Sequence, residues 1–155
     1  MYNKRTKLNN IKYMIINFHP QEKESKRGQE IIARLNPDNT QKVFRATEKT
    51  SEEWKAIINS DEELILVAPT YWWGLGYEFE KWLQNVITYD FAYKYNEQGS
   101  PEGLLNGRIF ELHITHGTPE VYAKNMRENI KQRLEAGIFG FCNAKADIKF
   151  YDPKA

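Results

Sequence analysis

The chain alternates between two patterns of hydrophobic and polar residues. Five segments have the composition and length of strands, and they cover residues 11–18, 41–46, 63–68, 108–116 and 144–151. Apolar residues at helical spacing predict four helices, which follow Ser25 and Thr50, run from Tyr77 to Thr88, and lie between Thr118 and Gly137. Strands that alternate with helices favour a parallel sheet with helices on both faces, so we predict a doubly wound α/β fold.

Short polar motifs support these boundaries. Ser25 is suited to cap the first helix, and Thr50 with Glu53 forms a capping box. Thr118 followed by Pro119 is a typical helix start. We expect the apolar stripes to face the core, among them Trp54, Ile57 and Ile58, then Leu75, Phe79, Trp82, Leu83, Val86 and Ile87, and finally Tyr122, Met126, Ile130 and Leu134.

The two last strands each have one apolar and one polar face. Glu111 and His113 alternate with apolar residues in the fourth strand, and Lys149 does so in the fifth. A buried charge is costly unless it is paired, so we expect these three side chains to meet water or a wet interface. No helix is predicted after the fifth strand, and we therefore expect the last helix of a doubly wound fold to be missing.

Composition narrows the possible functions. The chain has 155 residues, enough for one domain, which we place at residues 11–155 after a short polar tail at residues 1–10. A net charge of +1 gives no electrostatic case for nucleic acid or an anionic membrane. No apolar run is long enough for a signal peptide or a membrane span. A single cysteine, Cys142, suits a cytoplasmic protein, and we see no metal-ligand spacing.

Three unusual loops follow strands whose carboxyl ends meet at one edge of the predicted sheet. They are residues 19–25, 69–74 and 115–120. Ligands of such sheets bind beyond this edge, so the three loops predict a binding site.

Each loop has a functional and an ordinary interpretation. The helix start at Ser25 can hold a phosphate, or it can be a plain capped loop. The rings in "TYWWG" can form a wall for an isoalloxazine, or one of the two tryptophans can pack as core. His116 can supply a donor beside a flavin, or it can make a local hydrogen bond. The "GLG" that follows lacks the third glycine of a dinucleotide fingerprint, and we reject that interpretation.

Together these segments resemble the flavodoxin-like NAD(P)H:quinone oxidoreductases, which include DT-diaphorase and the ancillary flavoproteins of potassium-efflux systems. The motifs that carry the resemblance extend from about residue 11 to 151, and they are "INFHP" with a later serine, "PTYWWGLGYEFEKWLQNV", "DFAYKY", "GLLNGR" and "ITHGTPEVY". The implied fold has the strand order 2-1-3-4-5. The chain departs from the family pattern at Gly76, where proline is usual, at Glu80 and Gln84, and in "THGT", which lacks a second glycine.

The resemblance implies a set of site residues. Those expected to bind the cofactor are His19, Ser25, Pro69, Thr70, Tyr71, Trp72, Trp73, Thr115, Gly117 and Thr118. Tyr122 and His116 are expected to act in catalysis at the flavin edge. Tyr93 and Tyr95 are expected to line the nicotinamide and quinone pocket with Trp73, often across a dimer interface in this family.

The implied activity is transfer of hydride from NAD(P)H to a quinone-type acceptor, with both substrates using one pocket in turn. We expect FMN rather than FAD, because we find no extra segment to hold an adenine, and we expect a homodimer. Two alternatives remain open: a non-catalytic regulatory subunit that acts on a protein partner, and a one-electron carrier. Carriers tend to be strongly acidic, and the net charge of +1 argues against the latter.

Overall fold

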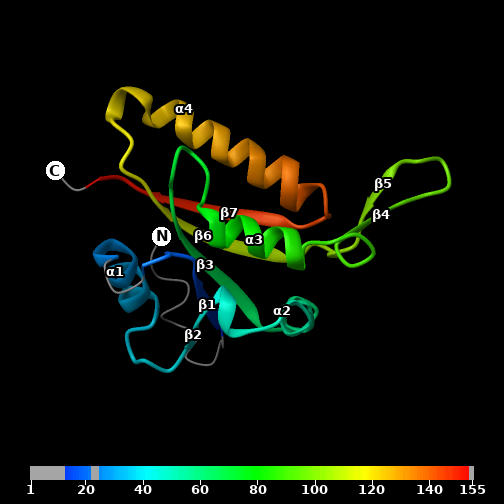
Figure 1. Ribbon diagram of the computed structural model, residues 1–155, viewed down its shortest axis with the longest axis horizontal. Coiled ribbons are helices and arrows are strands. Elements are labelled where there is room, and N and C mark those ends of the chain that lie inside the picture. Colours follow the sequence, from blue (N-terminus) through cyan, green and yellow to red (C-terminus); the bar gives the residue numbers. More distant parts are fainter. Residues whose placement is uncertain (1–12, 22–24, 154–155) are drawn as a thin grey trace.

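A five-stranded parallel sheet forms the centre of the computed structural model, which describes residues 13–21 and 25–153 (Figure 1). Its strands are β1 (Tyr13–Asn17), β2 (Lys42–Arg45), β3 (Glu63–Pro69), β6 (Ile109–Thr115) and β7 (Lys145–Tyr151). They follow the order β2-β1-β3-β6-β7. The predicted order is thus confirmed. The predicted polar tail at residues 1–10 lies outside the described residues.

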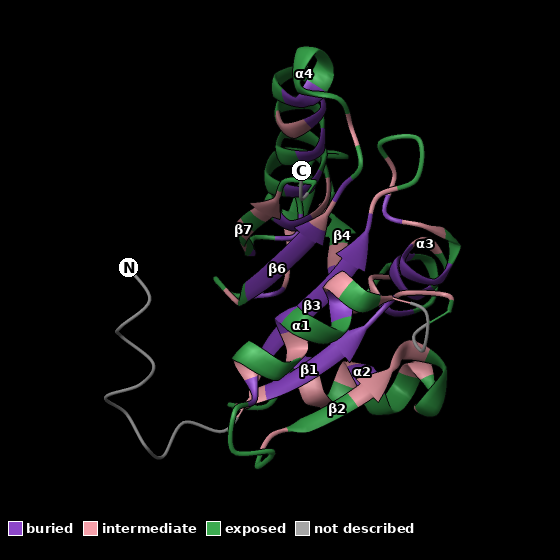
Figure 2. Cartoon of the chain, turned by 90° about the vertical axis from the view of Figure 1, so that its left-hand side faces the viewer, coloured by how far each residue is buried: buried purple, intermediate pink, exposed green. Residues whose placement is uncertain are grey.

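The middle strands are buried on both faces, as their continuous apolar sequences predict. Ile15 and Ile16 of β1 and Ile65 and Leu66 of β3 are all inaccessible to solvent. The edge strands β2 and β7 are partly exposed (Figure 2). Alternate residues of the inner strands therefore contribute to two separate hydrophobic clusters, one on each face of the sheet.

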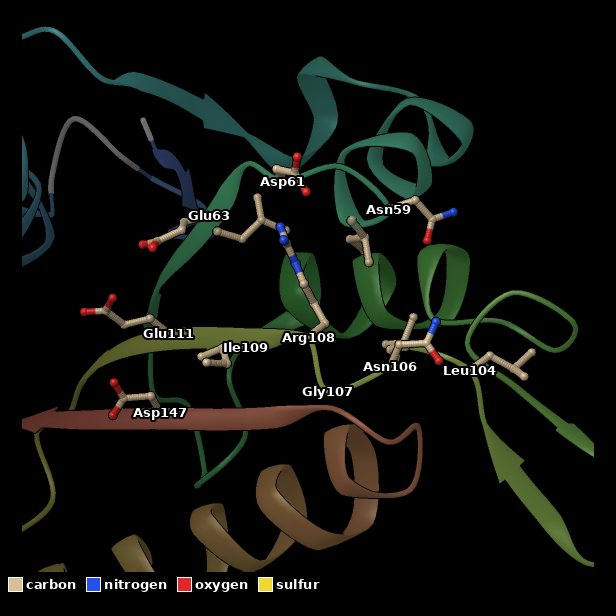
Figure 3. A pocket seen from close by; sticks show the side chains of 13 residues that line it. Asn59, Asp61, Glu63, Leu104, Asn106, Gly107, Arg108, Ile109, Glu111 and Asp147 are labelled. Carbon is tan, nitrogen blue, oxygen red and sulfur yellow. The ribbon is translucent and has the colours of Figure 1, made fainter. Parts of the chain in front are cut away.

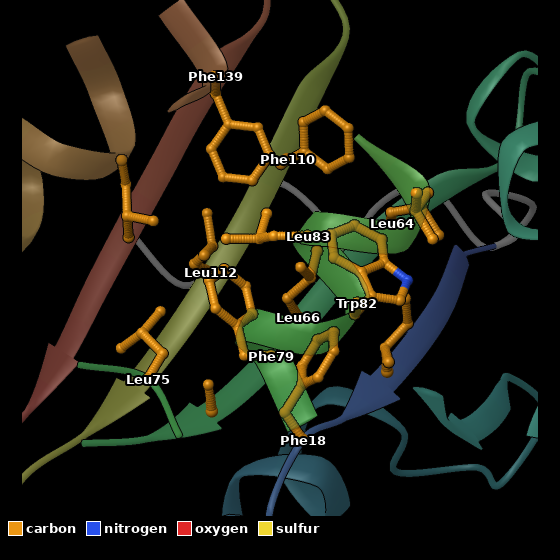
Figure 4. Close-up of a cluster of buried hydrophobic side chains, with 14 of the residues drawn as sticks. Phe18, Leu64, Leu66, Leu75, Phe79, Trp82, Leu83, Phe110, Leu112 and Phe139 are labelled. Atoms are coloured by element: carbon orange, nitrogen blue, oxygen red, sulfur yellow. The ribbon is translucent and has the colours of Figure 1, made fainter. Parts of the chain in front are cut away.

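Helices cover both faces of the sheet. Helix α1 (Lys26–Leu35) packs on the face of Ile15, Ile65 and Val67. The larger cluster lies on the other face, where α2 (Ser51–Ile58), α3 (Tyr77–Val86) and α4 (Glu120–Lys131) supply residues that include Trp54, Phe79, Trp82 and Met126 (Figure 4). Phe18 contacts Phe79 and Trp82 edge-on, with ring centroids 5.2 and 5.6 Å apart.

Helix boundaries agree with the predicted caps at two of three places. Gly28 N–H donates to Ser25 Oγ over 3.2 Å, and Glu53 N–H donates to Thr50 Oγ1 over 3.2 Å. At α4 the capping residue is Pro119 rather than Thr118. Leu75, predicted to belong to the apolar stripe of α3, lies before the helix begins but is buried as expected. The predicted stop at Gly137 is wrong, because a π-helical segment, η2 (Gln132–Gly140), continues directly from α4.

The long connection between α3 and β6 contains a small antiparallel hairpin. Its strands are β4 (Tyr93–Tyr95) and β5 (Pro101–Gly103). A separate 3₁₀ turn, η1 (Ala46–Glu48), follows β2. Because the hairpin leaves the end of α3 and leads into the start of β6, it lies at the amino-terminal edge of the sheet (Figure 1). Leu104 N–H donates to Ala92 O and closes its base.

The expectation of an exposed polar face on β6 is wrong. Glu111 is 5% exposed and His113 is 1% exposed, although Lys149 keeps about half of its side-chain surface. His113 lies 2.8 Å from Glu111 Oε1 and 2.6 Å from the Tyr151 hydroxyl, and Lys149 Nζ lies 3.6 Å from Glu111. Because these polar side chains contact one another, most of the free-energy cost of burying Glu111 and His113 is offset. Between β7 and Pro153 the described chain forms no helix.

Among residues 13–21 and 25–153, no helix is both long and apolar enough to cross a membrane. No group of three or more His, Cys, Asp or Glu side chains among them is arranged to hold a metal ion. Cys142 is a free, buried thiol, and its burial raises its pKa.

Candidate flavin site

The three loops predicted to form a site do converge. They leave β1, β3 and β6 at the carboxyl edge of the sheet, where Pro69 and Thr115 are register partners. Phe18 N–H donates to Val67 O over 2.9 Å, and Thr70 Oγ1 donates to Thr115 O over 2.7 Å. Parallel strand order therefore brings together loops that are about 50 residues apart in sequence.

The start of α1 is suited to an anion. The other three α-helices each carry one or two glutamates in the first turn, whereas α1 has none there. Acidic side chains at this position satisfy the positive end of the helix dipole, so α1 leaves that end to another negative group. Gly28 leaves room for the cap, since a Cβ at that position would lie 2.5 Å from Ser25 Oγ.

His19 organises the first loop through its ring. Its Nδ1 accepts the Gln21 N–H over 3.0 Å, and its own backbone N–H donates to Asn17 Oδ1 over 3.1 Å. The structure therefore shows a histidine that shapes the turn after β1. Residues 22–24 between this turn and Ser25 lie outside the described residues.

Two tryptophans occupy the centre of a tight turn after β3. Tyr71 and Gly74 exchange two backbone hydrogen bonds of 2.8 Å, and Trp72 and Trp73 both have positive φ, 49° and 63°. This is the pattern of a type I′ turn, which strongly favours Asn-Gly. Bulky residues there cost free energy, and such strain is found where function requires it. Neither tryptophan is core: Trp72 is 102% exposed and Trp73 is 38% exposed.

We expect Trp72→Asn to stabilise the protein while weakening flavin binding. Nothing buried is lost at this position, and asparagine tolerates positive φ, so the free energy of unfolding should rise by about 1 kcal/mol. Loss of the ring should weaken FMN binding about fivefold, the equivalent of one aromatic contact. Chemical denaturation and FMN titration measure the two effects. The control Trp72→Ala should weaken binding without the gain in stability, and unchanged FMN affinity in both variants would remove Trp72 from the site.

The third loop buries its histidine. The His116 side chain is inaccessible, with Nε2 2.9 Å from Asp152 Oδ1 and Nδ1 accepting the Thr118 N–H over 3.3 Å. Both ring nitrogens are therefore occupied within the protein. The prediction that His116 acts on a ligand at the flavin edge is not supported by these contacts, and the imidazole instead shapes the loop. Gly117, at the tip of the loop, is exposed.

Tyr122 lies at the surface rather than in the core stripe of α4. It is 56% exposed in the first turn of the helix, and Ala123 takes its expected buried place. Within the described residues no hydrogen-bond partner is recorded for the Tyr122 hydroxyl, which leaves it available to a ligand. Helix α4 begins directly after the third loop, so Tyr122 lies at the carboxyl edge of the sheet with Gly117.

Tyr93 and Tyr95 lie at the opposite edge of the sheet from Trp73. They form an aromatic cluster on the hairpin with Tyr89 and Phe141, with ring centroids 5.3–6.3 Å apart. The hairpin precedes β6 and the third loop follows it, so the length of this strand, about 20 Å, separates them. The expectation that these tyrosines and Trp73 line one pocket is therefore wrong within a single chain.

A cavity of about 650 Å³ also lies away from the three loops (Figure 3). It is lined by the starts of β3, β6 and β7, which contribute the carboxylates of Glu63, Glu111 and Asp147. Arg108 donates to the carbonyl oxygens of Ser60 and Glu62, and burial lowers the pKa of its guanidinium. The candidate flavin site is formed by loops at the other edge of the sheet, and this cavity is not part of it.

Sequence reasoning missed two residues that hold the site together. Arg27 donates to His116 O and Asp152 O, and the Asp152 carboxylate lies against His116 Nε2. Neither residue belongs to a motif. The only signal was Arg27 in the first turn of α1, a position where a basic residue is unfavourable to the helix dipole.

Comparison with known proteins agrees with the fold. A family model described as the flavodoxin-like fold matches residues 11–146, which is most of the chain. The chain belongs to this family. The family predicted from its motifs is thereby confirmed.

A curated relative from Haemophilus influenzae, an uncharacterized NAD(P)H oxidoreductase, is 28% identical over 117 residues. The match covers 70% of this chain and 57% of the relative, so the chain spans little more than half of that protein's length. Two solved structures share the fold. An NADPH-quinone reductase from P. pentosaceus has a TM-score of 0.71 at 15% identity, with 92% of this chain and 85% of that chain covered. An FMN-dependent NADH-azoreductase from Bacillus anthracis, in complex with FMN, has a TM-score of 0.63 at 17% identity, with 92% and 87% covered.

Proposed function

We propose that the protein is an FMN-dependent oxidoreductase that passes hydride from NAD(P)H to a quinone-type acceptor. The observation that carries this proposal is the convergence of an acid-free helix start, a strained aromatic turn and an exposed glycine at one edge of the sheet. The names of the relative and of the two structural neighbours, an NAD(P)H oxidoreductase, a quinone reductase and an azoreductase, support it. We also propose a cytoplasmic location, with which the free thiol of Cys142 is compatible. We propose that residues 11–155 form a single domain.

The residues present fit FMN. Ser25 and the first amides of α1 would hold the phosphate, Thr70 to Trp73 would lie along the isoalloxazine, and the Gly117 N–H would meet its pyrimidine edge. When bound, FMN would supply the hydride chemistry at N5. The protein then needs to position two substrates in turn over one face of the ring, with Tyr122 as a hydrogen-bond donor beside them.

Visible absorption of the purified protein and oxidation of NADH in the presence of a simple quinone test the proposal. We expect a flavin spectrum and quinone-dependent turnover. Bound FMN without turnover would favour the regulatory subunit or the electron carrier, and these differ in whether a protein partner is required. Purified protein that neither contains nor takes up FMN would contradict the proposal.

Tyr122→Phe should slow flavin reduction by NAD(P)H about tenfold, the effect of losing one useful hydrogen bond in the reaction. FMN affinity should be unchanged, because the side chain is exposed and the helix start keeps its backbone contacts. Stopped-flow measurement of the reductive half-reaction gives the rate. Val121→Ala, an exposed neighbour in the same turn, is the control. An unchanged rate in Tyr122→Phe would remove this residue from the mechanism.

We propose further that the protein is a homodimer in which the hairpin of one chain reaches the flavin site of the other. This arrangement supports a pocket role for Tyr93 and Tyr95 despite their distance from Trp73 in one chain. Mixing two inactive variants tests it. Ser25→Asp lacks a flavin site, and Tyr95→Ala lacks the hairpin ring.

A mixed dimer would combine an intact flavin site of one chain with an intact hairpin of the other. We therefore expect that co-refolding the two variants restores part of the activity, while neither alone is active. Sedimentation analysis of the mixture confirms that dimers have formed. Mixed dimers without activity would show that Tyr95 does not act across the interface.

A further inference from the structure

A fully buried histidine connects the loop after β6 with the chain that follows β7. His116 Nδ1 accepts the backbone N–H of Thr118, so the ring proton is on Nε2 and donates to Asp152. The acceptor is a carboxylate, which makes this a charge-assisted hydrogen bond and stronger than a neutral one. The Asp152 side chain is largely exposed, whereas the His116 ring that it contacts is buried, so the pair differs from a contact between two exposed side chains.

Arg27 holds the same two segments from the side of α1. One guanidinium nitrogen donates to His116 O over 2.7 Å, and the other donates to Tyr151 O and Asp152 O over 2.5 and 2.6 Å. We call Arg27, His116 and Asp152 the His116 network. It joins the helix proposed to bind phosphate with the loop proposed to meet the pyrimidine edge.

The network leaves one amide of the loop for a ligand. Thr115 O accepts from Thr70 Oγ1, His116 N–H donates to Tyr151 O over 3.4 Å, and Thr118 N–H is held by the imidazole. Among the described residues, no partner is recorded for the N–H of Gly117. A glycine peptide has wide rotational freedom, so its direction depends on the residues that fix both of its neighbours.

We infer that Asp152 is a positioning residue of the flavin site, which acts through His116 to aim the Gly117 N–H at the bound ring. The inference rests on the proposed function. The physical reason is preorganisation: with His116 and Thr118 fixed, the amide needs no reordering when the flavin binds. A donor at the pyrimidine edge also favours the reduced form, whose negative charge is concentrated near N1.

Asp152→Ala tests the inference. We expect the affinities for FMN and for riboflavin to fall by the same factor, about tenfold, because the loop meets the ring and not the phosphate. If the reduced form loses a further factor of about ten, the midpoint potential of the bound flavin becomes more negative by about 30 mV. In the flavin-free protein, hydrogen exchange of the Thr118 amide should become about tenfold faster, because its acceptor ring is no longer anchored.

Two matched variants separate positioning from general destabilisation. Asp152→Asn keeps an oxygen acceptor for His116 Nε2 and should restore parental affinity and potential. Arg127→Gln removes the other partner of the Asp152 carboxylate, an exposed contact of 3.3 Å, and should also leave both unchanged. Parental values in Asp152→Ala, or equal losses in Asp152→Asn, would overturn the inference.

The exchange measurement distinguishes this inference from the proposed function. A parent protein that binds no flavin contradicts the proposed function. Unchanged exchange of the Thr118 amide in Asp152→Ala overturns the positioning role whether or not flavin binds. A lower melting temperature with unchanged flavin affinity and potential would likewise overturn it, because the contact would then support only the fold.

Discussion

Ser25→Asp should weaken FMN binding about 1,000-fold, because it places a carboxylate against the phosphate that we propose to lie at the start of α1. Two like charges about 4 Å apart near a protein surface repel by about 4 kcal/mol. The helix itself should remain intact. Aspartate is as good an N-cap as serine, so it can accept the Gly28 N–H that Ser25 Oγ now accepts. Isothermal titration of flavin-free protein measures the affinity.

Riboflavin is the matched ligand for this experiment, because it has the ring and the ribityl chain but no phosphate. Its affinity should be the same for Ser25→Asp and the parent. Ser25→Asn, a cap of the same size without charge, should bind FMN nearly as the parent does. Equal FMN affinity in Ser25→Asp and the parent would show that the phosphate lies elsewhere.

Arg45→Met should destabilise the protein by about 3 kcal/mol, the usual cost of leaving a buried charge without its partner. Arg45 lies at the end of β2 and pairs with Glu78 in the first turn of α3, where their side chains are 18% and 9% exposed. Glu78 Oε2 already has no hydrogen-bond partner. Urea denaturation measures the loss, and because α3 follows the aromatic turn, FMN affinity should fall with it.

The double variant Arg45→Met with Glu78→Met identifies the cause. Replacing a whole buried pair with apolar side chains is often neutral, so most of the lost stability should return. Stability that stays low in the double variant would assign the loss to packing around β2 instead of to the unpaired carboxylate.

The elements and their order could be predicted because their signals are local. The run of apolar residues in β3 and the stripe of α3 with Phe79, Trp82 and Val86 are visible in a short window of sequence. Parallel order then required the three loops to meet, and they do. The stop at Gly137 was wrong for the converse reason, since glycine permits a helix end but the packing of Leu134 and Phe139 against the sheet decides whether the helix continues.

Side-chain roles within the site were less predictable. The "TYWWG" stretch indicated aromatic rings in a surface turn, but not the positive φ of Trp72 and Trp73, which depends on the closure between Tyr71 and Gly74. Tyr93 and Tyr95 were assigned to the pocket by resemblance, and their position relative to β6 places them at the other edge. A motif shows which residues are present, whereas their distance depends on the path of the chain between them.

The sequence by itself determined the family, the parallel strand order and the edge of the sheet at which the three loops meet, because hydrophobic period and strand alternation act over a few residues. Only the tertiary structure decided the environment of individual polar groups. His116 is enclosed by a carboxylate 36 residues away, and His113 is covered by a tyrosine 38 residues away. Tyr151 ends β7 and Asp152 follows it, and β7 pairs with β6 only in the folded sheet. The free energy of a polar side chain depends on such partners and not on its own position in the pattern.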